Sequence, residues 1–251
     1  MLDHITPLIL TYNEAPNIAR TLAGVSWAKD IVVVDSFSDD DTLQIAASFP
    51  QVRVIQRKFD SHRSQWEFGL KQTKISTPWV LALDADYVLS DDLIDELKFL
   101  SPKHHTAGYR ANFVYCINGK KLQSGIYPPV TVLYRRESAS YIQDGHTQRV
   151  ALDGHIEDLR SPIFHDDRKS LERWLTAQAR YTELEAQKLL SLRRAELGFA
   201  DRMRRWRFVM PPVMFVYCLI VRGGIFDGRA GFCYAFQRAR AELMLSHRLH
   251  G

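Results

Sequence analysis

The sequence has few cysteines and lacks a leader-like start, and both absences narrow its class. Its three cysteines, Cys116, Cys218 and Cys233, are widely spaced and odd in number. This pattern argues against a disulfide framework and a zinc knuckle, and it favours a reducing compartment. The opening segment MLDHITPLILTYNE has no basic stretch followed by a long apolar run, so we predict no secretory signal peptide. We expect a cytoplasmic protein, in the cytosol or on the inner face of the cytoplasmic membrane.

Glycine-rich phosphate loops are also missing. Residues 7–20, which contain the first apolar segment and the start of the first helical pattern, have neither the G-x-G-x-x-G pattern nor a Walker loop. They also lack the glycine- and lysine- or arginine-rich loop that a nucleotidyltransferase would normally carry. A phosphate bound by this chain is therefore not expected to rest on a glycine-rich loop.

The chain of 251 residues has 46% hydrophobic and 25% charged residues, which is ordinary for a soluble globular protein. Its net charge of +4 is unevenly distributed. Residues 193–251 hold eleven arginines and four acidic residues, a net charge of +7, so the first 192 residues carry −3. The basic excess lies entirely in the C-terminal tail.

The first 100 residues alternate short apolar runs with helical patterns. The runs are 7–13, 30–36, 51–57 and 79–86, and the helical patterns between them are 16–25, 40–49 and 61–72. Strands with apolar residues on both faces are typical of a parallel sheet covered by helices. We predict an α/β fold with a nucleotide-binding half over residues 1–100, a β-rich half of mixed strand direction over 101–168, and a helical appendage over 169–251.

Polar side chains stand at the ends of three of the predicted strands. They are Thr11, Tyr12, Asn13 and Glu14 after the first, Asp35 and Ser36 after the second, and Asp84 and Asp86 after the fourth. Ligands of open parallel sheets bind beyond the carboxyl ends of the strands, so we expect these groups to converge. Carboxylates do not hold phosphate directly, but they bind a divalent cation that can bridge to it.

The pair Asp84 and Asp86 has a structural alternative. Ser90, Asp91 and Asp92 come shortly afterwards, and the whole stretch can be a strand-to-helix turn in which these three residues cap the next helix. We assign that capping role to Asp91 and Asp92. For Asp84 and Asp86 we favour a binding role, because acidic residues recur at equivalent strand ends.

Three segments carry a family resemblance: LTYNEAPNIARTL (10–22), IVVVDSFSDDDT (31–42) and WVLALDADYVLSDDL (79–93). In order and spacing the sequence resembles the inverting glycosyltransferases of family 2, which have the GT-A fold. The segments FDSHRSQWEFGLKQT (59–73) and YIQDGHTQRV (141–150) make it similar to the subgroup of lipopolysaccharide core β-1,4-glucosyltransferases. The resemblance covers most of the chain.

The resemblance implies a UDP-sugar donor and a divalent metal ion, Mn²⁺ or Mg²⁺. Asp35 would accept a hydrogen bond from uracil, and the first loop with Thr11, Tyr12 and Glu14 would line the base and ribose. Asp84 would contact the ribose or a metal-bound water, and Asp86 would ligate the metal. Arg63 would pair with the nucleotide, its alternative being a solvated helix arginine.

The general base is the least defined part of this scheme. An inverting transfer needs one carboxylate that deprotonates the acceptor, and the resemblance places it within QDGHTQRV, where relatives have a Glu near Gln148. Glutamine cannot act as a base, so the candidates are Asp144, which we prefer, and His146. The alternative for Asp144-Gly145 is a tight turn.

Further departures from the family concern Phe37, where many relatives have Gly, and Tyr87, where the close subgroup has an acid. Late in the chain, His165 in PIFHDD is a candidate metal or diphosphate ligand, with Asp166 and Arg168 behind it. Its alternative is a structural histidine.

The tail combines arginines with an uncharged apolar run from Phe208 to Val221. Fourteen helical residues would span about 21 Å, short of the roughly 30 Å hydrocarbon core, and Pro211 and Pro212 are expected to interrupt the helix. We predict association with an anionic membrane surface through residues 202–240. The alternative is a helical hairpin packed on the catalytic domain, or at the interface of a homo-oligomer. No nucleic-acid reader motif is present.

Together these features predict an inverting glycosyltransferase that acts on a glycolipid or lipid-linked saccharide in the synthesis of cell-envelope polysaccharide or lipopolysaccharide. The alternative is a non-catalytic nucleotide-sugar-binding or scaffold protein that has kept the fold and lost the base, as Gln148 suggests.

Overall fold

The computed structural model describes residues 1–144, 147–193, 196–206 and 208–250, without the side chains of residues 143, 144, 147, 148 and 200. The chain divides into two compact units. Unit 1 comprises residues 1–114, 127–143 and 148–168, and unit 2 comprises residues 115–126, 144–147 and 169–251. Compared with the predicted boundary after residue 168, unit 2 also takes the short segments 115–126 and 144–147.

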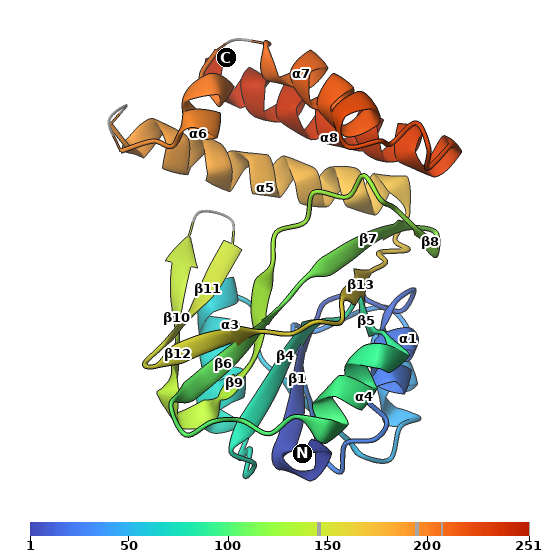
Figure 1. The fold of residues 1–251 in the computed structure, drawn as a ribbon, viewed down its shortest axis with the longest axis vertical. Coiled ribbons are helices and arrows are strands. Elements are labelled where there is room, and N and C mark those ends of the chain that lie inside the picture. The colour runs from blue at the N-terminus through green and yellow to red at the C-terminus, as the bar shows by residue number, and fades with distance from the viewer. Residues whose placement is uncertain (145–146, 194–195, 207, 251) are drawn as a thin grey trace. The chain divides into compact units, whose positions relative to one another are not determined.

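Unit 1 begins with the predicted alternation of strands and helices (Figure 1). Its first elements are η1 (Leu2–His4), β1 (Ile5–Thr11), α1 (Ile18–Gly24), β2 (Ile31–Asp35), α2 (Thr42–Ala47), β3 (Val52–Gln56), α3 (His62–Gln72), β4 (Trp79–Asp84), β5 (Tyr87–Leu89) and α4 (Asp91–Phe99). Ser61 and Ser90 cap α3 and α4, each accepting a hydrogen bond from the backbone N–H three residues on. Ser90 is thus the cap of α4, whereas Asp91 and Asp92, to which we assigned that role, lie in the first turn of the helix.

The β-rich half comes next, as expected. Its elements are β6 (Thr106–Ala111), β7 (Phe113–Ile117), β8 (Lys120–Lys121), β9 (Val130–Arg135), η2 (Arg136–Ser138), β10 (Ala139–Asp144), β11 (Thr147–Leu152), β12 (His155–Asp158) and β13 (Ile163–His165). Strand β7 passes from unit 1 into unit 2, where it forms an antiparallel hairpin with β8.

A seven-stranded mixed sheet with the order β12-β6-β9-β4-β1-β2-β3 is the framework of unit 1. Strands β4, β1, β2 and β3 are parallel, whereas β9 runs antiparallel to both β4 and β6. All the carboxyl ends of the parallel strands therefore lie at one edge. The prediction of an α/β fold with a mixed sheet is confirmed.

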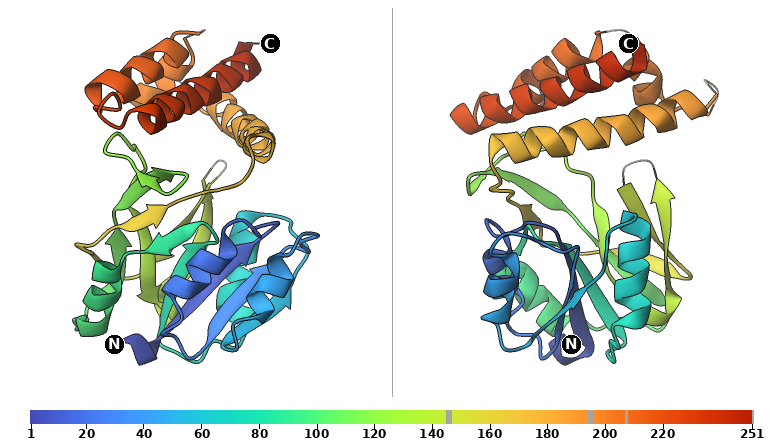
Figure 2. Two further views of the ribbon diagram at one scale, coloured as in Figure 1. Left: turned by 90° about the vertical axis from the view of Figure 1, so that its right-hand side faces the viewer. Right: turned by 180° about the vertical axis from the view of Figure 1, so that it is seen from behind.

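Alternating side chains of the central strands fill a core on each face of this sheet. On one face Ile9 and Val33 pack with Leu22 of α1 and Leu93 of α4. On the other face Leu8 and Val34 pack with Trp66 of α3. Figures 1 and 2 show these helices on opposite sides of the sheet. Burial on both faces explains why the strands are apolar without alternation.

Unit 2 is largely helical. It contains α5 (Leu171–Ser191), α6 (Phe199–Arg204), α7 (Met210–Val216), the π-helical turn η3 (Tyr217–Val221) and α8 (Arg229–His250). Helix α8 packs against both α5 and α7, which Figures 1 and 2 show side by side with it. Among the described residues, none of the helices combines the length and apolar character that crossing a bilayer requires.

One local expectation for this unit is wrong. Pro211 and Pro212 do not interrupt a helix, because α7 starts at Met210 and the prolines occupy its first turn. The N–H that proline lacks has no helical partner in that turn, so the residue costs little there.

Candidate functional site

The register of the parallel strands brings the predicted strand-end residues together. Thr11 is paired with Asp35 across β1 and β2, and Leu10 is paired with Asp84 across β1 and β4. Thr11, Asp35 and Asp84 therefore form one row along the carboxyl edge of the sheet. The expected convergence results from this register, since neighbouring parallel strands end at the same edge.

Asp35 connects this row to the neighbouring residues through hydrogen bonds. Its carboxylate is fully buried and accepts hydrogen bonds from Thr11 Oγ1 (2.9 Å), Ser38 N (2.9 Å), Ser38 Oγ (2.5 Å) and Gln56 Nε2 (3.2 Å). A carboxylate offers about four lone-pair sites, so these bonds occupy its acceptor capacity. The predicted contact of Asp35 with a nucleobase stays a prediction, and it requires one of these bonds to be exchanged.

The loops after β1 and β2 are joined to each other. Asn13 N donates to Ser38 Oγ (2.8 Å), Asn13 Oδ1 accepts from Asp39 N (2.9 Å), and Glu14 N donates to Thr42 Oγ1 (2.7 Å). Asn13 has a φ of 56°, which asparagine tolerates better than most residues. The first loop is thus held by the second.

Two aromatic rings stand out from these joined loops. Tyr12 is 59% exposed and Phe37 is 55% exposed. Phe37 has a φ of 62°, a left-handed conformation that is strained for a bulky residue. Glycine would adopt this backbone conformation without strain, so the chain presents an aromatic side chain here at some energetic cost.

Asp86 lies beside His165, although the two residues are far apart in the sequence. Strand β5 pairs antiparallel with β13, which sets His165 opposite Tyr87, and Asp166 N donates to Asp86 O (3.0 Å). His165 Nε2 lies 3.4 Å from Asp86 Oδ2, and the two side chains are 15% and 13% exposed. The two residues predicted as metal ligands are therefore neighbours in the fold.

Tyrosine rings surround this pair. Tyr87 Oη and Tyr127 Oη share a hydrogen bond of 2.7 Å, and the Tyr127 ring stacks on His165 with centroids 4.9 Å apart. The Tyr87 ring meets His165 edge-on. Burial, and then the negative charge of Asp84, raise the pKa of Tyr87 well above its usual value, so the phenol stays neutral. At the position where the resemblance led us to expect an acid, the chain therefore has a ring that packs against His165.

The segment after His165 is anchored to the start of α1 by Asn17, which is fully buried. Its Nδ2 donates to Glu14 Oε2 and Asp167 Oδ1 (both 2.9 Å), and its Oδ1 accepts from Arg168 N (2.9 Å) and Arg20 Nη2 (2.8 Å).

Arg20 adds a second anchor. It forms an ion pair with the buried carboxylate of Asp166, which Arg168 Nε also contacts at 2.9 Å, and its Nη2 donates to Asp166 O (2.9 Å). The first loop, α1 and the segment after β13 therefore form one hydrogen-bonded body around the site.

This donor set fits a divalent ion in part. Among the described residues no group of three or more His, Cys, Asp or Glu side chains has the arrangement of a complete metal site. Asp86 and His165 supply two donors, and a hard cation commonly completes its shell with phosphate oxygens and water. The site therefore suits an ion that arrives with a phosphate-bearing substrate, or whose coordination shell that substrate completes.

The predicted base lies outside the described residues. His146 is not described, and neither are the side chains of Asp144 and Gln148. The strand leading to them is well held, because Tyr141 N donates to Glu67 Oε1 (2.5 Å) and the Tyr141 ring stacks on Trp66. Burial, and then the neighbouring Tyr134, raise the pKa of Tyr141.

Arg63, the remaining predicted nucleotide contact, is exposed in the first turn of α3. Its role stays a prediction.

Sequence inspection missed the residues that hold the site. Asn17 and Arg20 lie within the segment 10–22 that carries the resemblance, but nothing in the sequence indicated their role or that of Tyr127. Their partners are remote: Asp166 lies 146 residues after Arg20. In the sequence, the acidic and basic side chains of HDDR were the one sign of these anchoring contacts, because a run of unlike charges after a strand suggests ion pairs. The partner across the fold could not be named from the chain alone.

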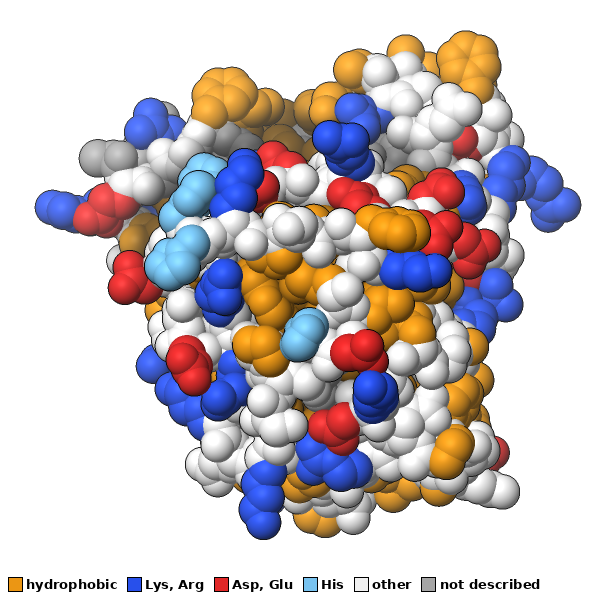
Figure 3. All heavy atoms as spheres, turned by 60° about the horizontal axis from the view of Figure 1, so that its bottom comes forward, with side chains coloured by type: hydrophobic (Ala, Val, Ile, Leu, Met, Phe, Trp, Pro, Cys, Tyr) orange, Lys and Arg blue, Asp and Glu red, His pale blue; other side chains and the backbone are white. Residues whose placement is uncertain are grey.

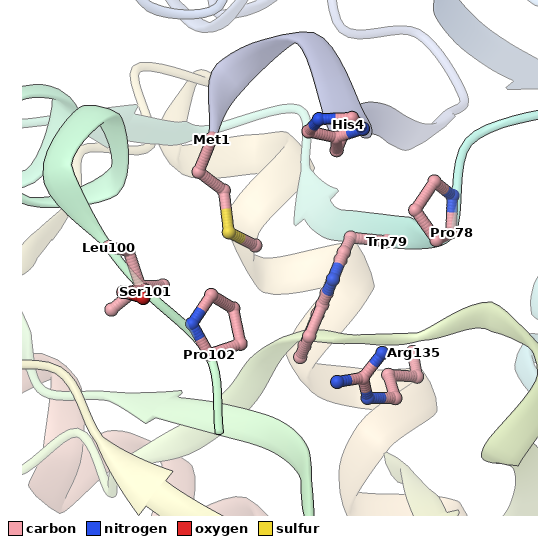
Figure 4. A pocket seen from close by; sticks show the side chains of 8 residues that line it. All are labelled: Met1, His4, Pro78, Trp79, Leu100, Ser101, Pro102 and Arg135. Carbon is pink, nitrogen blue, oxygen red and sulfur yellow. The ribbon is translucent and has the colours of Figure 1, made fainter. Parts of the chain in front are cut away.

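A pocket of about 270 Å³ lies at the other end of the sheet. His4 precedes β1 and Trp79 begins β4, so this pocket is at the amino ends of the parallel strands. Arg135 lies over the Trp79 ring, 4.7 Å from its centroid, as Figure 4 shows. On the face seen in Figure 3, hydrophobic side chains gather between charged ones. This pocket lies away from the polar strand ends.

Comparisons with known proteins relate the chain to glycosyltransferases. Residues 8–128 match the family model described as Glycosyl transferase family 2. An uncharacterized glycosyltransferase of Rickettsia felis is 27% identical over 204 residues, which cover 75% of this chain and 71% of the relative. The lipopolysaccharide core biosynthesis glycosyltransferase LpsC of Rhizobium meliloti is 23% identical over 245 residues, covering 94% of this chain and 87% of LpsC.

Solved structures show the same fold. A mannosyltransferase from Pyrobaculum calidifontis, solved in complex with GDP-Man and Mn²⁺, superposes with a TM-score of 0.50 at 16% identity, covering 99% of this chain and 76% of that one. Glucosyl-3-phosphoglycerate synthase from Mycobacterium tuberculosis also gives a TM-score of 0.50 at 15% identity, covering 74% of this chain and 79% of that one.

Proposed function

We propose that this chain, whose residues 8–128 match the model of glycosyl transferase family 2 and which has the GT-A fold, is an inverting hexosyltransferase that uses a UDP-sugar. The acceptor we propose is a glycolipid or lipid-linked saccharide, in the synthesis of cell-envelope polysaccharide or lipopolysaccharide. The likeness to LpsC over nearly the whole chain supports this acceptor class. On this proposal the protein works at the inner face of the cytoplasmic membrane.

The juxtaposition of Asp86 and His165 at the carboxyl edge of the sheet carries the proposal. Asp86 lies in the turn between β4 and β5, His165 ends β13, and Asn17, Arg20 and Tyr127 hold the segments around them. Asp86 and His165 would hold Mn²⁺ or Mg²⁺, with Asp84 at the ribose or at a metal-bound water, and the ion would neutralise charge on a departing diphosphate. The mannosyltransferase that was solved with Mn²⁺ and a nucleotide-sugar supports a metal ion and a donor of this class.

The reaction then needs a base on the acceptor side. We propose that Asp144, with His146 as the second candidate, takes the proton of the acceptor hydroxyl. The hydroxyl oxygen forms a new bond to the anomeric carbon while the bond to the diphosphate breaks on the opposite side, which inverts the configuration. Thr11, Tyr12, Glu14 and Asp35 hold the nucleotide, and Arg63 pairs with its phosphates.

Calorimetric titration with UDP, GDP, CDP and dTDP, each with and without Mn²⁺ or Mg²⁺, tests the donor class. We expect selective, metal-dependent binding of UDP. Selective binding of GDP would replace the proposed donor, and binding of none by the folded protein would contradict the assignment of the site.

The variant Asp86→Ala tests the metal role. We expect metal-dependent nucleotide affinity to fall by at least about 100-fold, since even residues that only support a metal ligand are worth 10–100-fold. The matched control is Asp91→Ala in the first turn of α4, an exposed acid that should leave binding unchanged. Equal binding by both variants would refute the metal role of Asp86.

A scaffold function is the competing proposal, and Gln148 favours it because glutamine cannot serve as a base. Slow sugar transfer or UDP-sugar hydrolysis that disappears in Asp144→Asn would argue for catalysis. Tight nucleotide binding without turnover on any acceptor would favour the scaffold.

A further inference from the structure

The turn between η3 and α8 of unit 2 exposes large apolar side chains. Val221 is 68% exposed and Phe226 is 84% exposed, and Ile220 and Ile225 are similarly exposed. We call residues 220–229 the hairpin turn. Four large apolar side chains so close together on a surface are unusual for an isolated soluble protein.

The conformation of the hairpin turn is fixed by its own backbone. Ile225 N donates to Leu219 O (3.0 Å) and Gly224 N donates to Cys218 O (3.1 Å). Gly224 O lies 2.0 Å from where a Cβ of residue 231 would be, so only glycine permits this approach between the turn and α8. Gly228 has a φ of 63°, which suits glycine.

A buried carboxylate ties the turn to the β7–β8 region of the same unit. Asp227 accepts from Gln123 N (3.1 Å), Ser124 N (3.0 Å) and Ser124 Oγ (2.7 Å), and its carbonyl oxygen accepts from Lys120 Nζ (2.6 Å). The aspartate points inward while its neighbour Phe226 points outward. The exposure of the apolar side chains is therefore built into a well-held turn.

The charge around the turn has one sign. Between residues 208 and 250 the two acidic residues are Asp227 and Glu242, each only 4% exposed. Arg222, Arg229 and Arg240 are exposed in the same stretch. The exposed surface of residues 208–250 thus combines apolar groups with positive charge, and it presents no exposed acid.

Not every arginine of the predicted membrane-associating stretch, residues 202–240, contributes to this surface. Arg204 Nη2 pairs with Glu242 (2.9 Å), and Arg205 donates to Leu192 O (2.8 Å). These two arginines act inside unit 2, where they join α6 to α8 and to the end of α5. The outward charge comes from residues that lie further along the chain.

The chemistry of the surface selects its partner. A second copy of the same surface would bring like charges together, which is unfavourable. Three of the four apolar side chains are valine or isoleucine, which do not stack with nucleobases as single-stranded nucleic acid requires. Arginines flanking apolar side chains fit an anionic lipid surface, with the guanidinium groups at phosphates and the apolar groups among acyl chains.

We propose that the hairpin turn inserts into one leaflet of an anionic bilayer, to the depth of the boundary between headgroups and acyl chains. Ile220, Val221, Ile225 and Phe226 enter the boundary, and Arg222 and Arg229 bind lipid phosphates. The biological setting rests on the proposed function, because a lipid-borne acceptor gives the enzyme a reason to be there. The physical claim concerns vesicles alone, and its test needs neither donor nor acceptor.

Co-sedimentation with vesicles tests the claim. We expect the protein to bind vesicles of phosphatidylcholine with phosphatidylglycerol, and to bind pure phosphatidylcholine at least tenfold more weakly. The double variant Ile225→Ser/Phe226→Ser, which we call the hairpin variant, should lose about 30-fold or more in partitioning. The matched control is Phe99→Ser/Leu171→Ser, which removes two apolar side chains of similar exposure outside the hairpin turn and should stay within twofold of the wild type. Equal binding by the hairpin variant and its control would overturn the proposal.

Insertion is separated from adsorption by a fluorescent probe. In Phe226→Trp, the fluorescence emission added by the new tryptophan should shift to the blue on vesicle binding and should be quenched by lipids brominated near the top of the acyl chain. In Phe99→Trp, the added emission should show neither change. Binding without quenching of Trp at position 226 would contradict insertion.

Two further measurements keep this proposal distinct from others. The hairpin variant should bind nucleotide with wild-type affinity. If the wild type itself binds no nucleotide, the proposed function is refuted and the vesicle result is unaffected. Light scattering without lipid should give the same mass for the wild type and the hairpin variant. A smaller mass for the variant would identify the turn as a contact between copies and overturn the lipid assignment.

Discussion

Buried acidic residues have different structural roles in the two units. In unit 1 the buried acids Asp35 and Asp166 bind the loops that surround the carboxyl edge of the sheet. In unit 2 the buried acids Asp227 and Glu242 bind the turn and the helices to one another.

The outer surfaces differ as a result. Around the site in unit 1, carboxylates and a histidine remain near the surface at Asp84, Asp86 and His165. Between residues 208 and 250 of unit 2, the exposed charged side chains are arginines alone. Net charge is therefore not enough to define a binding surface, because burial decides which sign faces outward.

The largest effect on stability is expected at Asp227. Replacing it with Ala leaves Ser124 and Gln123 without their acceptor, and hydrogen bonds to a charged group are worth about 1.5–3 kcal/mol each. Because the freed donors can be partly rehydrated, we expect a loss of about 3 kcal/mol in the free energy of unfolding. Urea denaturation measures it.

The same variant also tests whether the two units act independently. Asp227→Ala should weaken vesicle binding, because the turn loses its anchor, and should leave nucleotide affinity unchanged. Asp227→Asn retains one acceptor oxygen and should lose less stability. Wild-type stability in Asp227→Ala would contradict the anchoring role.

A smaller loss is expected at Asn17. Asn17→Ala removes four hydrogen bonds of neutral or partly exposed groups, each worth about 1 kcal/mol. Because some of the partners are then rehydrated, we expect the free energy of unfolding to fall by only about 2 kcal/mol. Because Asn17 joins Glu14 to the segment after His165, nucleotide affinity should fall together with stability.

Vesicle binding is the contrasting measurement for Asn17→Ala, and it should be unchanged. The control is Asn118→Ala, which alters an asparagine of the β7–β8 turn in unit 2. A variant at Asn17 that binds nucleotide as tightly as the wild type would show that the network is structural only.

The smallest effect is expected at Phe37, and it has the opposite sign. A left-handed backbone costs a non-glycine residue about 1–2 kcal/mol, and glycine gives back about 0.5–1 kcal/mol of the gain through chain entropy. Phe37→Gly should therefore stabilise the protein by about 0.5–1 kcal/mol in thermal or urea unfolding.

Lys74, which has a φ of 57° and lies away from the polar strand ends, is the matched control. Lys74→Gly should stabilise by a similar amount. If only Lys74→Gly is stabilising, the Phe37 ring makes contacts that offset its backbone strain.

The sequence was sufficient for the series of strands and helices in unit 1, because burial on both faces of a parallel sheet leaves runs of apolar residues that can be recognised. It also identified the strand-end groups Thr11, Asp35, Asp84 and Asp86, since their position at the ends of runs implies a common edge. The error at Pro211 arose from local rules, as proline is unfavourable inside a helix and acceptable in its first turn.

Periodicity and motif spacing are local properties of the chain, and they were enough to predict the fold class, the resemblance to glycosyltransferases and the residue types available for chemistry. Three features needed the folded chain: Asp86 meets His165, Asn17 and Arg20 hold the segment after it, and the acids of residues 208–250 are buried while arginines of that stretch face outward. These features depend on contacts between residues that lie far apart in the sequence, and on side-chain burial that no single segment contains.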